Sequence, residues 1–348
     1  MTAAGGAIID RRVRLVAYRH AWHSAHAGYG VLTRYAERVI RARPLPRLLV
    51  PRRLLWRIAN GVIAYDWESL ATELRAGADL VLSRGCVYHV LYAENTYQYL
   101  GLLSGCRGNR VVATFHLPTW RHRDLVRSDW HLRRLSAAIC LGRTQMEFLA
   151  GIVGADRTFF VPRGVDADYF SPGSDADGRD ANLCLFIGEH LRDFATLRDS
   201  LDRIARARPQ TRCIARTERA AVSRNDTDPA VLRRDRMSEA ELLQLYRRAA
   251  LLLLPLVDAT DNNTAVEAMA CGLPMVVTDV GSVRDYVTPE CAVFVPPGDA
   301  ARFAEAVIDL LDDPNRLRAM SGAARQRGLA LNWPTVIREL QAVYDAVA

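Results

Sequence analysis

Short runs of apolar residues alternate with helical patterns along almost the whole chain. In the first half, the strand-like runs are VRLVAY (13–18), DLVLSRG (79–85), RVVATFH (110–116), SAAICLG (136–142) and the extended RTFFVPRGVD (157–166). Helical spacing of apolar residues instead marks GVLTRYAERVIRA (30–42) and RTQMEFLAGIVG (143–154). Strands that alternate with helices in this way predict βαβ units and therefore an α/β fold with parallel sheets.

The alternation is interrupted once, at FSPGSDADGRDANL (170–183), and then resumes. This segment is rich in Asp, Gly and Ser and is typical of a linker. The strand-like runs after it are LCLFIGEH (183–190), RCIART (212–217), LLLLPLV (251–257), MVVTDV (275–280) and AVFVPPGD (292–299). The helical patterns after it cover 193–208, 238–250, 265–271 and 300–313.

Two halves with the same alternation predict two Rossmann-like parallel-sheet domains that face a central cleft. Ligands of such sheets bind beyond the carboxyl ends of the strands. We expect the domains to cover 1–169 and 170–332. The remaining residues, 333–348, form a predicted terminal helix, which we expect to pack across the domain junction.

All basic residues of the chain except histidine are arginines. The 348 residues include 46 Lys+Arg against 39 Asp+Glu, which gives a formal charge of +7, and no lysine occurs. Any side-chain cation that binds a phosphate here must therefore be an arginine, with a planar two-pronged donor group in place of an ammonium.

Cysteine usage and hydropathy favour a cytoplasmic location. Seven cysteines are scattered without a CxxC pair, so neither a disulfide framework nor a zinc site is expected. The N-terminal residues lack the apolar core of a signal peptide. No run approaches the roughly 20 apolar residues that a membrane-spanning helix needs. Peripheral contact with the inner membrane face stays open.

Polar residues crowd the start of one predicted helix in the second half. The sequence DATDNNT (258–264) lies between the strand-like run that ends at residue 257 and the helical AVEAMAC (265–271). Asp, Asn and Thr are strong N-cap residues, so a capped helix is one interpretation. The other is an anion site, because a helix N-terminus offers free N–H groups and the positive end of its dipole.

Five segments, in chain order, resemble motifs of the family 4 glycosyltransferases. They are ATFHLP (113–118), FVPRGVDADYFSPG (160–173), GEHLRDFATL (188–197), ELLQLYRRAALLLLPL (241–256) and EAMACGLPMVVTDVGSVRDYV (267–287). The terminal helix, with its W…VY pattern, also fits. The resemblance is strong from about residue 157 onward and looser before it.

Members of that family have the GT-B fold, and the resemblance implies their activity. The first domain is then the acceptor side, and the second binds a nucleotide-diphosphate sugar. The sugar is transferred with retention of anomeric configuration, without a metal ion or another cofactor. The acceptor is open among a glycan, a lipid-linked molecule and a small molecule. A helix N-terminus and an arginine can bear the negative charge that develops on the leaving diphosphate.

The resemblance also assigns roles to single residues. Glu267 matches a glutamate that holds the donor ribose, Arg192 stands near a phosphate-binding cation, and His116 matches a histidine beside the donor sugar. We expect His116, Arg192 and Asp261 to be the catalytic residues. The simpler alternatives are a solvent-exposed glutamate, a surface arginine paired with Asp193, and a structural histidine.

The polar cluster departs from the family pattern at one position. The family has a second glutamate eight positions before Glu267, and this chain has Ala259 there. Asp258 and Asp261 flank it, and either carboxylate can reach the sugar or cap the helix. The backbone N–H groups expected to face the diphosphate are those of Asp261, Asn262, Asn263 and Thr264, with helix capping as the alternative for Asn263.

Four further residues belong to the predicted donor site. Glu189 and His190 precede Arg192 and are expected to line the cleft. Gly28 and Gly30 allow a backbone to approach the donor phosphates or the acceptor, although a tight turn also explains them. The histidines near these glycines lack a carboxylate or cysteine partner at ligand spacing, so no metal site is expected.

The segment PRLLVPRRLLWRIAN (46–60) is basic and amphipathic. A segment of this kind can lie on an anionic membrane, bind an acidic acceptor, or form a core-facing helix with solvated arginines. Basic residues interleaved with an aromatic platform do not occur, so no nucleic-acid partner is expected.

Two other functions share the predicted donor site. A nucleotide-sugar epimerase of the GT-B fold needs paired acid/base carboxylates in the cleft. A non-catalytic relative that acts as a binding subunit stays open because Ala259 replaces the usual glutamate.

Overall fold

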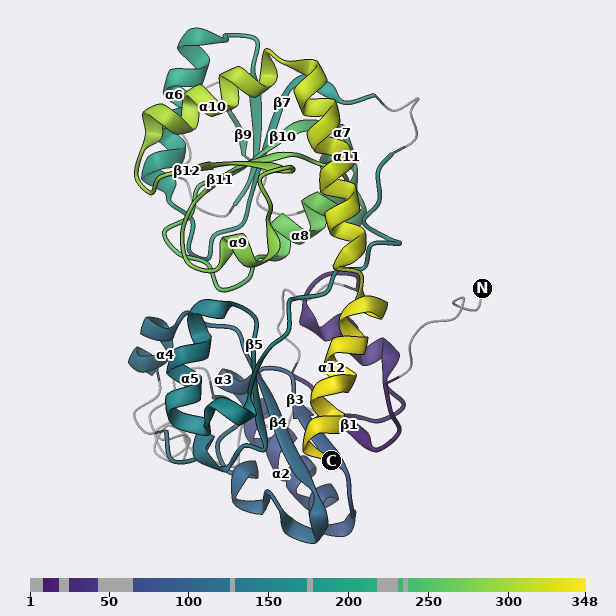
Figure 1. Ribbon diagram of the computed structural model, residues 1–348. Coiled ribbons are helices and arrows are strands. Elements are labelled where there is room, and N and C mark those ends of the chain that lie inside the picture. Colours follow the sequence, from purple (N-terminus) through teal and green to yellow (C-terminus); the bar gives the residue numbers. More distant parts are fainter. Residues whose placement is uncertain are drawn as a thin grey trace. The chain divides into compact units, whose positions relative to one another are not determined.

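The computed structural model describes residues 9–18, 25–42, 65–125, 129–173, 178–217, 231–233 and 237–348. The chain divides into two compact units (Figure 1). Unit 1 comprises Met1–Arg163 with Trp333–Ala348, and unit 2 comprises Gly164–Asn332. The sequence placed the boundary after residue 169, whereas the contacts divide the chain after Arg163. Packing of 333–348 across the domain junction stays a prediction.

Unit 1 is built on a sheet of six parallel strands in the order β2-β1-β3-β4-β5-β6. The strands are β1 Val13–Val16, β2 Val39–Ile40, β3 Val87–Val90, β4 Arg110–Phe115, β5 Ala137–Cys140 and β6 Thr158–Phe160. Strands β3 and β5 are buried along their whole length, as expected for a parallel sheet covered on both faces.

Helices cover both faces of the unit 1 sheet. The α-helices are α2 Trp67–Leu82, α3 Ala93–Thr96, α4 Thr119–Leu125, α5 Met146–Val153 and α12 Trp333–Val347. The 3-10 segments are η1 Tyr29–Tyr35, η2 Leu100–Leu103, η3 Cys106–Gly108, η4 Leu132–Arg134, η5 Arg143–Gln145 and η6 Ala155–Arg157. Apolar side chains of α12 pack on one face of the sheet, and those of α2 and α5 pack on the other.

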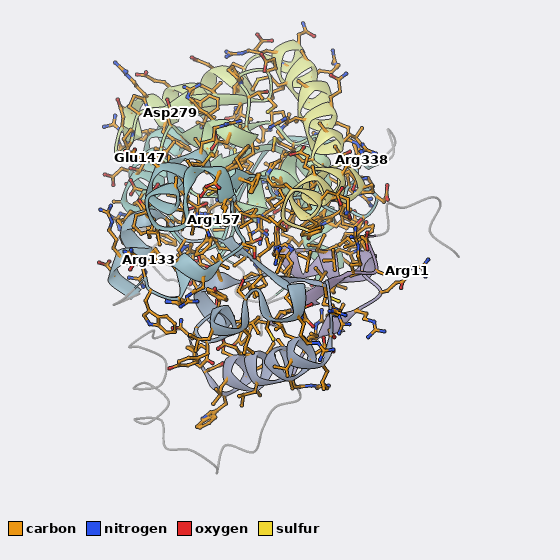
Figure 2. All side chains as sticks on the ribbon, turned by 60° about the horizontal axis from the view of Figure 1, so that its bottom comes forward. Arg11, Arg133, Glu147, Arg157, Asp279 and Arg338 are labelled. Atoms are coloured by element: carbon orange, nitrogen blue, oxygen red, sulfur yellow. The ribbon has the colours of Figure 1, made fainter. Side chains whose placement is uncertain are left out.

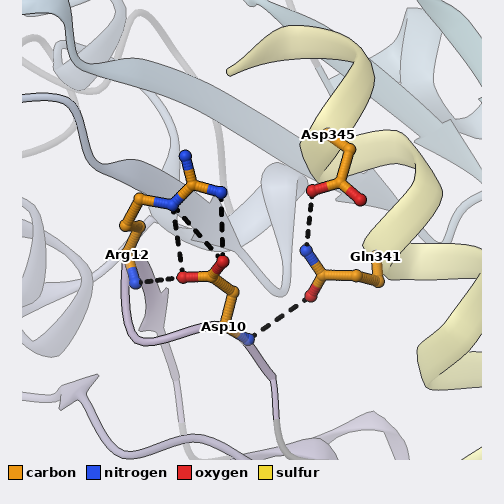
Figure 3. Close-up of polar contacts among 4 residues, drawn as sticks. All are labelled: Asp10, Arg12, Gln341 and Asp345. Carbon is orange, nitrogen blue, oxygen red and sulfur yellow. Dashed lines mark hydrogen bonds and ion pairs between the residues drawn. The ribbon is translucent and has the colours of Figure 1, made fainter.

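Polar contacts fasten α12 to the segment before β1 (Figure 3). The backbone N–H of Asp10 donates to Oε1 of Gln341 over 3.3 Å, and Nε2 of Gln341 donates to Asp345 over 3.0 Å. The carboxylate of Asp10 also accepts hydrogen bonds from Arg12. Two ends of the chain that are far apart in sequence therefore meet in one unit.

A buried imidazole joins α12 to the sheet. Nδ1 of His89 lies 2.7 Å from the Tyr344 hydroxyl, and Nε2 lies 2.7 Å from Oγ1 of Thr114. Burial lowers the pKa of His89 to about 3, so the ring is neutral near pH 7.

Two element predictions for unit 1 are wrong, and one strand was missed. Residues 30–42, expected to be a helix, form η1 followed by β2. Residues 79–85, expected to be a strand, contain the last turn of α2. A short apolar run fits a strand and a helix end equally well by composition. The missed strand is β3, whose apolar character is interrupted by His89.

Unit 2 holds a second sheet of six parallel strands, in the order β12-β11-β10-β7-β8-β9. The strands are β7 Asp180–Ile187, β8 Arg212–Arg216, β9 Val231–Arg233, β10 Ala249–Leu254, β11 Met275–Thr278 and β12 Ala292–Val295. The helices are α6 Phe194–Ala207, α7 Glu239–Arg248, α8 Asn263–Ala270, α9 Val283–Tyr286, α10 Ala300–Leu311 and α11 Pro314–Ala330. The strands and helices predicted for 183–313 are confirmed.

Charged side chains lie at the surface of both units. Figure 2 labels Arg11, Arg133 and Arg338 of unit 1 and Asp279 of unit 2, and all four side chains are exposed. Among the described residues, no helix is long and apolar enough to cross a membrane. The basic segment 46–60 lies outside the described residues.

Candidate functional site

The order of strands in unit 2 reverses between β7 and β10. From β7 the chain continues through α6 to β8 on one side, while β10 lies on the other side of β7. The loops that follow β7 and β10 therefore separate at the carboxyl end of the sheet. In open α/β sheets this position forms the crevice in which ligands bind.

The loop after β7 is fixed against the segment after β10. The N–H of Asp193 donates to the carbonyl of Pro255 over 3.1 Å, and the N–H of Val257 donates to the carbonyl of Leu191 over 3.0 Å. Leu191 adopts a positive φ of 56°, so the chain turns sharply just before Arg192. These contacts place Arg192 beside the start of α8.

Hydrogen bonds to neutral oxygens hold the guanidinium of Arg192. Nε donates to the carbonyl of Ile187 over 2.9 Å, and Nη1 donates to the carbonyl of His190 over 3.1 Å. Nη2 donates to Oγ1 of Thr264 over 3.2 Å and lies 3.5 Å from Oδ1 of Asn262. Arg192 has no ion pair with a carboxylate in the described part of the chain.

The alternative role for Arg192, a surface residue paired with Asp193, does not match the structure. Asp193 caps α6 instead, because its carboxylate accepts from the N–H of Thr196 over 2.9 Å and from the Thr196 hydroxyl over 2.6 Å. Part of the Arg192 side chain stays exposed, yet dense packing around the guanidinium lowers its pKa from 12.5 to about 10. The group remains charged near pH 7.

Asn262 is the N-cap of α8, and its side chain accepts from the N–H of Ala265 over 3.2 Å. Asn263 is exposed at the first position of the helix, so capping by Asn263 is not observed. The N–H groups of Asn263 and Thr264 have no hydrogen-bond acceptor among the described residues. The Arg192 guanidinium lies beside this end of the helix, through its contacts with Thr264 and Asn262, and therefore beside the positive end of the helix dipole.

A cation beside a helix N-terminus is electrostatically unfavourable, because the guanidinium and the dipole end have the same sign. An anion that binds between them relieves this repulsion and gains hydrogen bonds from both. At the other end of α8, Arg325 donates to the carbonyl of Ala270 over 2.6 Å, and Arg179 donates to those of Cys271 and Gly272 over 2.8 Å. The geometry therefore favours an anion at the N-terminus of α8.

Glu267 is buried, so the alternative of a solvent-exposed glutamate is wrong. Its side chain is 5% exposed, and Oε2 accepts a hydrogen bond from the Tyr246 hydroxyl over 2.9 Å. Burial and the neighbouring carboxylate raise the pKa of Tyr246 well above its ordinary value. Local sequence patterns do not indicate this contact, because Tyr246 lies on another helix, α7.

The two aspartates that flank Ala259 differ in their surroundings. Oδ1 of Asp258 accepts from the N–H of Ala259 over 2.7 Å, and a Cβ on Gly281 would lie 2.4 Å from the same oxygen. The N–H of Ser282 donates to the carbonyl of Ala259 over 2.7 Å. Asp261 is half-buried immediately before the N-cap of α8. The carboxylate of Asp258 is thus held by the backbone of its own loop. Asp261 is closer in sequence to the N-terminus of α8, where the anion is expected to bind.

Glu189 and His190 lie at the same end of the sheet as Arg192. Oε1 of Glu189 accepts from the hydroxyl of Thr217, just after β8, over 3.0 Å. His190 is exposed. The loops after β7 and β10 thus hold Glu189, His190, Arg192 and the residues 258–262 at the carboxyl end of the sheet, whereas Glu267 lies further along α8.

In unit 1, His116 follows β4 and has both ring nitrogens engaged. Nε2 lies 2.8 Å from the carbonyl of Leu91, and Nδ1 lies 3.2 Å from Nη2 of Arg163. A carbonyl only accepts, so Nε2 carries the proton and Nδ1 accepts from the arginine. The ring also stacks on Tyr92, with centroids 4.5 Å apart. Arg163 was not singled out from the sequence, although it lies within the segment FVPRGVDADYFSPG.

Two buried side chains that the sequence did not indicate hold the His116 loop. Oε1 of Glu94 accepts from the N–H groups of His116 and Leu117, at 2.6 and 2.8 Å. Nε2 of Gln145 donates to the carbonyls of Phe115 and Leu117, at 3.2 and 2.9 Å. Glu94 thus binds the N–H groups of the His116 loop and Gln145 binds its carbonyls, so the backbone that carries His116 is held in one conformation.

Gly28 and Gly30 flank the buried Tyr29. Gly28 has a φ of 83° and precedes η1, so a turn that favours glycine is present there. The Tyr29 ring meets the His116 ring edge to face, with centroids 5.1 Å apart. The glycines therefore border the surroundings of His116. The described residues contain no group of three or more His, Cys, Asp or Glu arranged to hold a metal ion.

Comparison with known proteins places the unit 2 part of the candidate site inside a region that matches a family model. A family model described as "Glycosyl transferases group 1" matches residues 182–313, which include the Arg192 loop and all of α8. D-inositol 3-phosphate glycosyltransferase 1 from Catenulispora acidiphila is 39% identical over 30% of this chain and 25% of its own length. MMP alpha-(1->4)-mannosyltransferase from Mycolicibacterium hassiacum is 24% identical over 96% of this chain and 98% of its own.

Coverage of the other relatives is partial. The D-inositol 3-phosphate glycosyltransferase from Geodermatophilus obscurus is 32% identical over 56% of this chain and 49% of its own length. For this protein and the one from Catenulispora acidiphila, the chain thus matches a quarter to a half of the relative.

Solved structures share the two-unit fold. Sucrose-phosphate synthase from Thermosynechococcus elongatus superposes with a TM-score of 0.64 at 19% identity, over 88% of this chain and 82% of that one. HepE from Anabaena in complex with UDP-glucose gives a TM-score of 0.64 at 14% identity, over 90% and 86%. The chain therefore has the GT-B fold of these proteins, with two parallel-sheet α/β domains.

Proposed function

The chain belongs to the group 1 glycosyltransferases, and from this premise we propose that it transfers a sugar from a nucleotide-diphosphate sugar with retention of anomeric configuration. The donor is held by the second domain, 170–332, and the acceptor by the first, 1–169. The proposal needs no metal ion, because protein groups in unit 2 can bear the charge of the diphosphate.

The observation that carries the proposal is the position of Arg192 at the N-terminus of α8. The guanidinium has only neutral oxygens as partners, and the neighbouring N–H groups of Asn263 and Thr264 have no acceptor in the described part of the chain. A diphosphate supplies the missing negative charge and the missing acceptors. Arginine suits this role because its planar donor group matches two phosphate oxygens at once.

The same groups assist the reaction. Departure of the nucleoside diphosphate concentrates negative charge on its β-phosphate, and Arg192 with the start of α8 stabilises that charge in the transition state. The acceptor attacks from the face that the diphosphate leaves, and a phosphate oxygen takes the acceptor proton. The protein mainly positions the two substrates.

Three residues complete the proposed donor site. Glu267 binds the ribose hydroxyls, and Asp261 binds sugar hydroxyls in place of the absent glutamate at Ala259. The His116 ring lies beside the sugar and acts through its neutral, Nε2-protonated form. Both ring nitrogens of His116 already take part in hydrogen bonds, Nδ1 with Arg163 and Nε2 with the Leu91 carbonyl. The ring therefore contacts the sugar through its carbon edge or its face, and not through a free nitrogen.

The names of the relatives suggest which acceptors to test first. D-inositol 3-phosphate glycosyltransferases and a phosphatidyl-myo-inositol mannosyltransferase are among them. We therefore propose a hydroxyl acceptor that carries a phosphate group. Inositol phosphates and phosphatidylinositol are the first candidates.

Calorimetric titration tests the donor site. We expect one of UDP, GDP, ADP and dTDP to bind the wild-type protein, and binding to weaken at least tenfold in Arg192→Gln. The matching nucleotide sugars are then incubated with the acceptors, and the anomeric configuration of the product is read by nuclear magnetic resonance. Binding of no nucleotide, or equal binding by Arg192→Gln, contradicts the assignment of the site.

Ala259 favours a second candidate, a binding subunit without activity. In that case a nucleoside diphosphate sugar binds with normal affinity, yet neither transfer nor slow hydrolysis of the donor occurs with any acceptor. Epimerised sugar in the absence of an acceptor would instead identify an epimerase.

A further inference from the structure

Two buried residues on α8 serve different halves of the proposed donor site. Thr264 and Glu267 are three residues apart, which places their side chains on the same side of the helix. Thr264 accepts from the Arg192 guanidinium, which the proposed function assigns to the diphosphate, and Glu267 is assigned to the ribose. One turn of α8 therefore carries a contact to each half of the donor.

The Tyr246 side chain, from α7, reaches both of these residues. Its hydroxyl lies 2.9 Å from Oε2 of Glu267 and also forms a side-chain hydrogen bond with Thr264. Tyr246 is close enough to Arg192 to interact with its charge. The Tyr246 ring is completely buried and meets the Phe170 ring edge to face, with centroids 6.0 Å apart. A rigidly packed hydroxyl thus bridges the two residues of α8.

The donors of these hydrogen bonds all point the same way. A guanidinium only donates, so Oγ1 of Thr264 accepts from Nη2 of Arg192 over 3.2 Å. An ionised carboxylate only accepts, so the Tyr246 hydroxyl donates to Glu267. The Thr264 proton is then left to donate to the Tyr246 oxygen. We call these four residues the α8 network, in which three hydrogen bonds run from a cation to an anion and strengthen one another.

We propose that Tyr246 is a positioning residue that couples recognition of the ribose by Glu267 to binding of the diphosphate by Arg192. The inference rests on the proposed function, because both ends of the α8 network must contact the donor. Tyr246 is fully buried and acts only through its neighbours. It orients the carboxylate at one end and, through Thr264, the guanidinium at the other.

The coupling has a consequence for Thr264, at the diphosphate end of the network. Loss of the Thr264 hydroxyl interrupts the network between Arg192 and Tyr246, while the carboxylate of Glu267 and its hydrogen bond from Tyr246 are kept. In an uncoupled site this change affects the diphosphate alone. In the coupled site it also weakens the preference for a ribose that carries its hydroxyls.

Calorimetry with two ligands tests the coupling on the full chain. The ligands are the nucleoside diphosphate that binds wild type and its 2′,3′-dideoxy analogue, and the ratio of their dissociation constants measures recognition of the ribose hydroxyls. The variants are Tyr246→Phe, Thr264→Val and Thr264→Ser, of which the serine variant keeps a hydroxyl. Tyr344→Phe is the control, because it also removes a buried hydroxyl, 2.7 Å from Nδ1 of His89 in unit 1. Circular dichroism checks that all variants fold.

We expect wild type, Thr264→Ser and Tyr344→Phe to prefer the nucleoside diphosphate over its dideoxy analogue about tenfold or more, as one charge-assisted hydrogen bond predicts. The preference falls about fivefold in Tyr246→Phe and in Thr264→Val, which is the size of coupling within one hydrogen-bond network. If Tyr246→Phe does not fold, the two Thr264 variants decide the test.

A wild-type preference in Thr264→Val overturns the coupling, even where Tyr246→Phe loses the preference. An equal loss in Thr264→Ser assigns the effect to packing of the threonine methyl group, and an equal loss in Tyr344→Phe assigns it to general loosening of the fold. Both outcomes overturn the inference, as does a wild-type protein that binds the two ligands equally. These results leave the proposed function in place, whereas binding of no nucleotide by wild type overturns the function and the inference together.

Discussion

A Cβ atom on Gly188 would lie 2.8 Å from Nη2 of Arg192 and 3.3 Å from its Cζ atom. Gly188 is the first residue after β7 and has a φ of 98°. The absence of a side chain at this position therefore leaves space for the guanidinium that faces α8. The glycine and the arginine act together, four residues apart in the sequence.

Gly188→Ala is expected to displace the Arg192 guanidinium and to weaken binding of the nucleoside diphosphate by about tenfold or more, since one lost charge-assisted hydrogen bond costs about 1.5–3 kcal/mol. The positive φ adds a penalty of roughly 1–2 kcal/mol in stability. Gly298→Ala is the control, because Gly298 also has a positive φ but a Cβ there meets no atom within 4 Å. Equal nucleotide affinity in the two variants would contradict the steric explanation.

Arg192→Lys is expected to lose most of the nucleotide affinity. The guanidinium donates from three nitrogens to oxygens on β7, the loop and α8, and an ammonium cannot occupy all three directions. Calorimetry on Arg192→Lys and Arg192→Gln measures the loss. Full affinity in the lysine variant shows that only a point charge is required.

Some of this site was predictable from the sequence, and some was not. The helix at 263–270 was predictable because Asn262 and its neighbours are N-cap residues and GLP ends the pattern. Arg192 was found because the segment GEHLRDFATL resembles a family loop that carries a phosphate-binding cation. The burial of Glu267 was not predictable, since it depends on Tyr246 from another helix. Local residue patterns do not report contacts between elements that are distant in the chain.

The same limit explains the errors in unit 1. The apolar run Leu80–Leu82 has the composition of a strand, and only the packing of α2 distinguishes its buried side from its exposed side. In β3, His89 is tolerated in the core because Tyr344, 255 residues later in the chain, binds its ring. A window of local sequence shows neither the residues on which α2 packs nor Tyr344, the partner of His89.

Glu267 is expected to serve both stability and donor binding. Glu267→Ala leaves the Tyr246 hydroxyl buried without its carboxylate acceptor, which costs about 1–3 kcal/mol in the free energy of unfolding. Tyr246→Phe removes the same hydrogen bond but keeps the carboxylate. If Glu267 also binds the ribose, Glu267→Gln loses more nucleotide affinity than Tyr246→Phe. Similar affinities in these two variants indicate that the carboxylate has only a structural role.

His122 is expected to make the protein less stable in mild acid. The residue is 4% exposed between Phe115 and Phe148, and neither ring nitrogen has a hydrogen-bond partner among the described residues. Burial lowers the pKa of His122 to about 4 in the folded state, below the 6.5 of an unperturbed imidazole. The unfolded state therefore binds the proton more readily, and stability falls as the pH decreases from 6.5 towards 4.

Urea denaturation at pH 7 and pH 5 measures this effect. The His122 contribution lost over that interval is about 2 kcal/mol. In His122→Leu the decrease should be smaller by that amount, while the loss due to His89 remains. An unchanged difference between the two pH values in the leucine variant would show that His122 does not titrate in this range.

The two aspartates beside Ala259 are expected to separate sugar transfer from nucleotide binding. Asp261 is half-buried just before α8, so its negative charge repels a bare diphosphate while it can accept hydrogen bonds from sugar hydroxyls. Asp261→Asn should therefore bind the nucleoside diphosphate as tightly as wild type or more tightly, and turn over the nucleotide sugar at least tenfold more slowly.

Asp258→Asn is the matched control for this prediction, because it removes the same charge three residues earlier. The side-chain oxygen of an asparagine can still accept from the N–H of Ala259, so the loop held by Gly281 and Ser282 is preserved. Steady-state rates and nucleotide affinities are measured for both variants. A slower Asp258→Asn with a normal Asp261→Asn would assign the sugar contact to Asp258. Normal rates in both would show that neither carboxylate replaces the glutamate absent at Ala259.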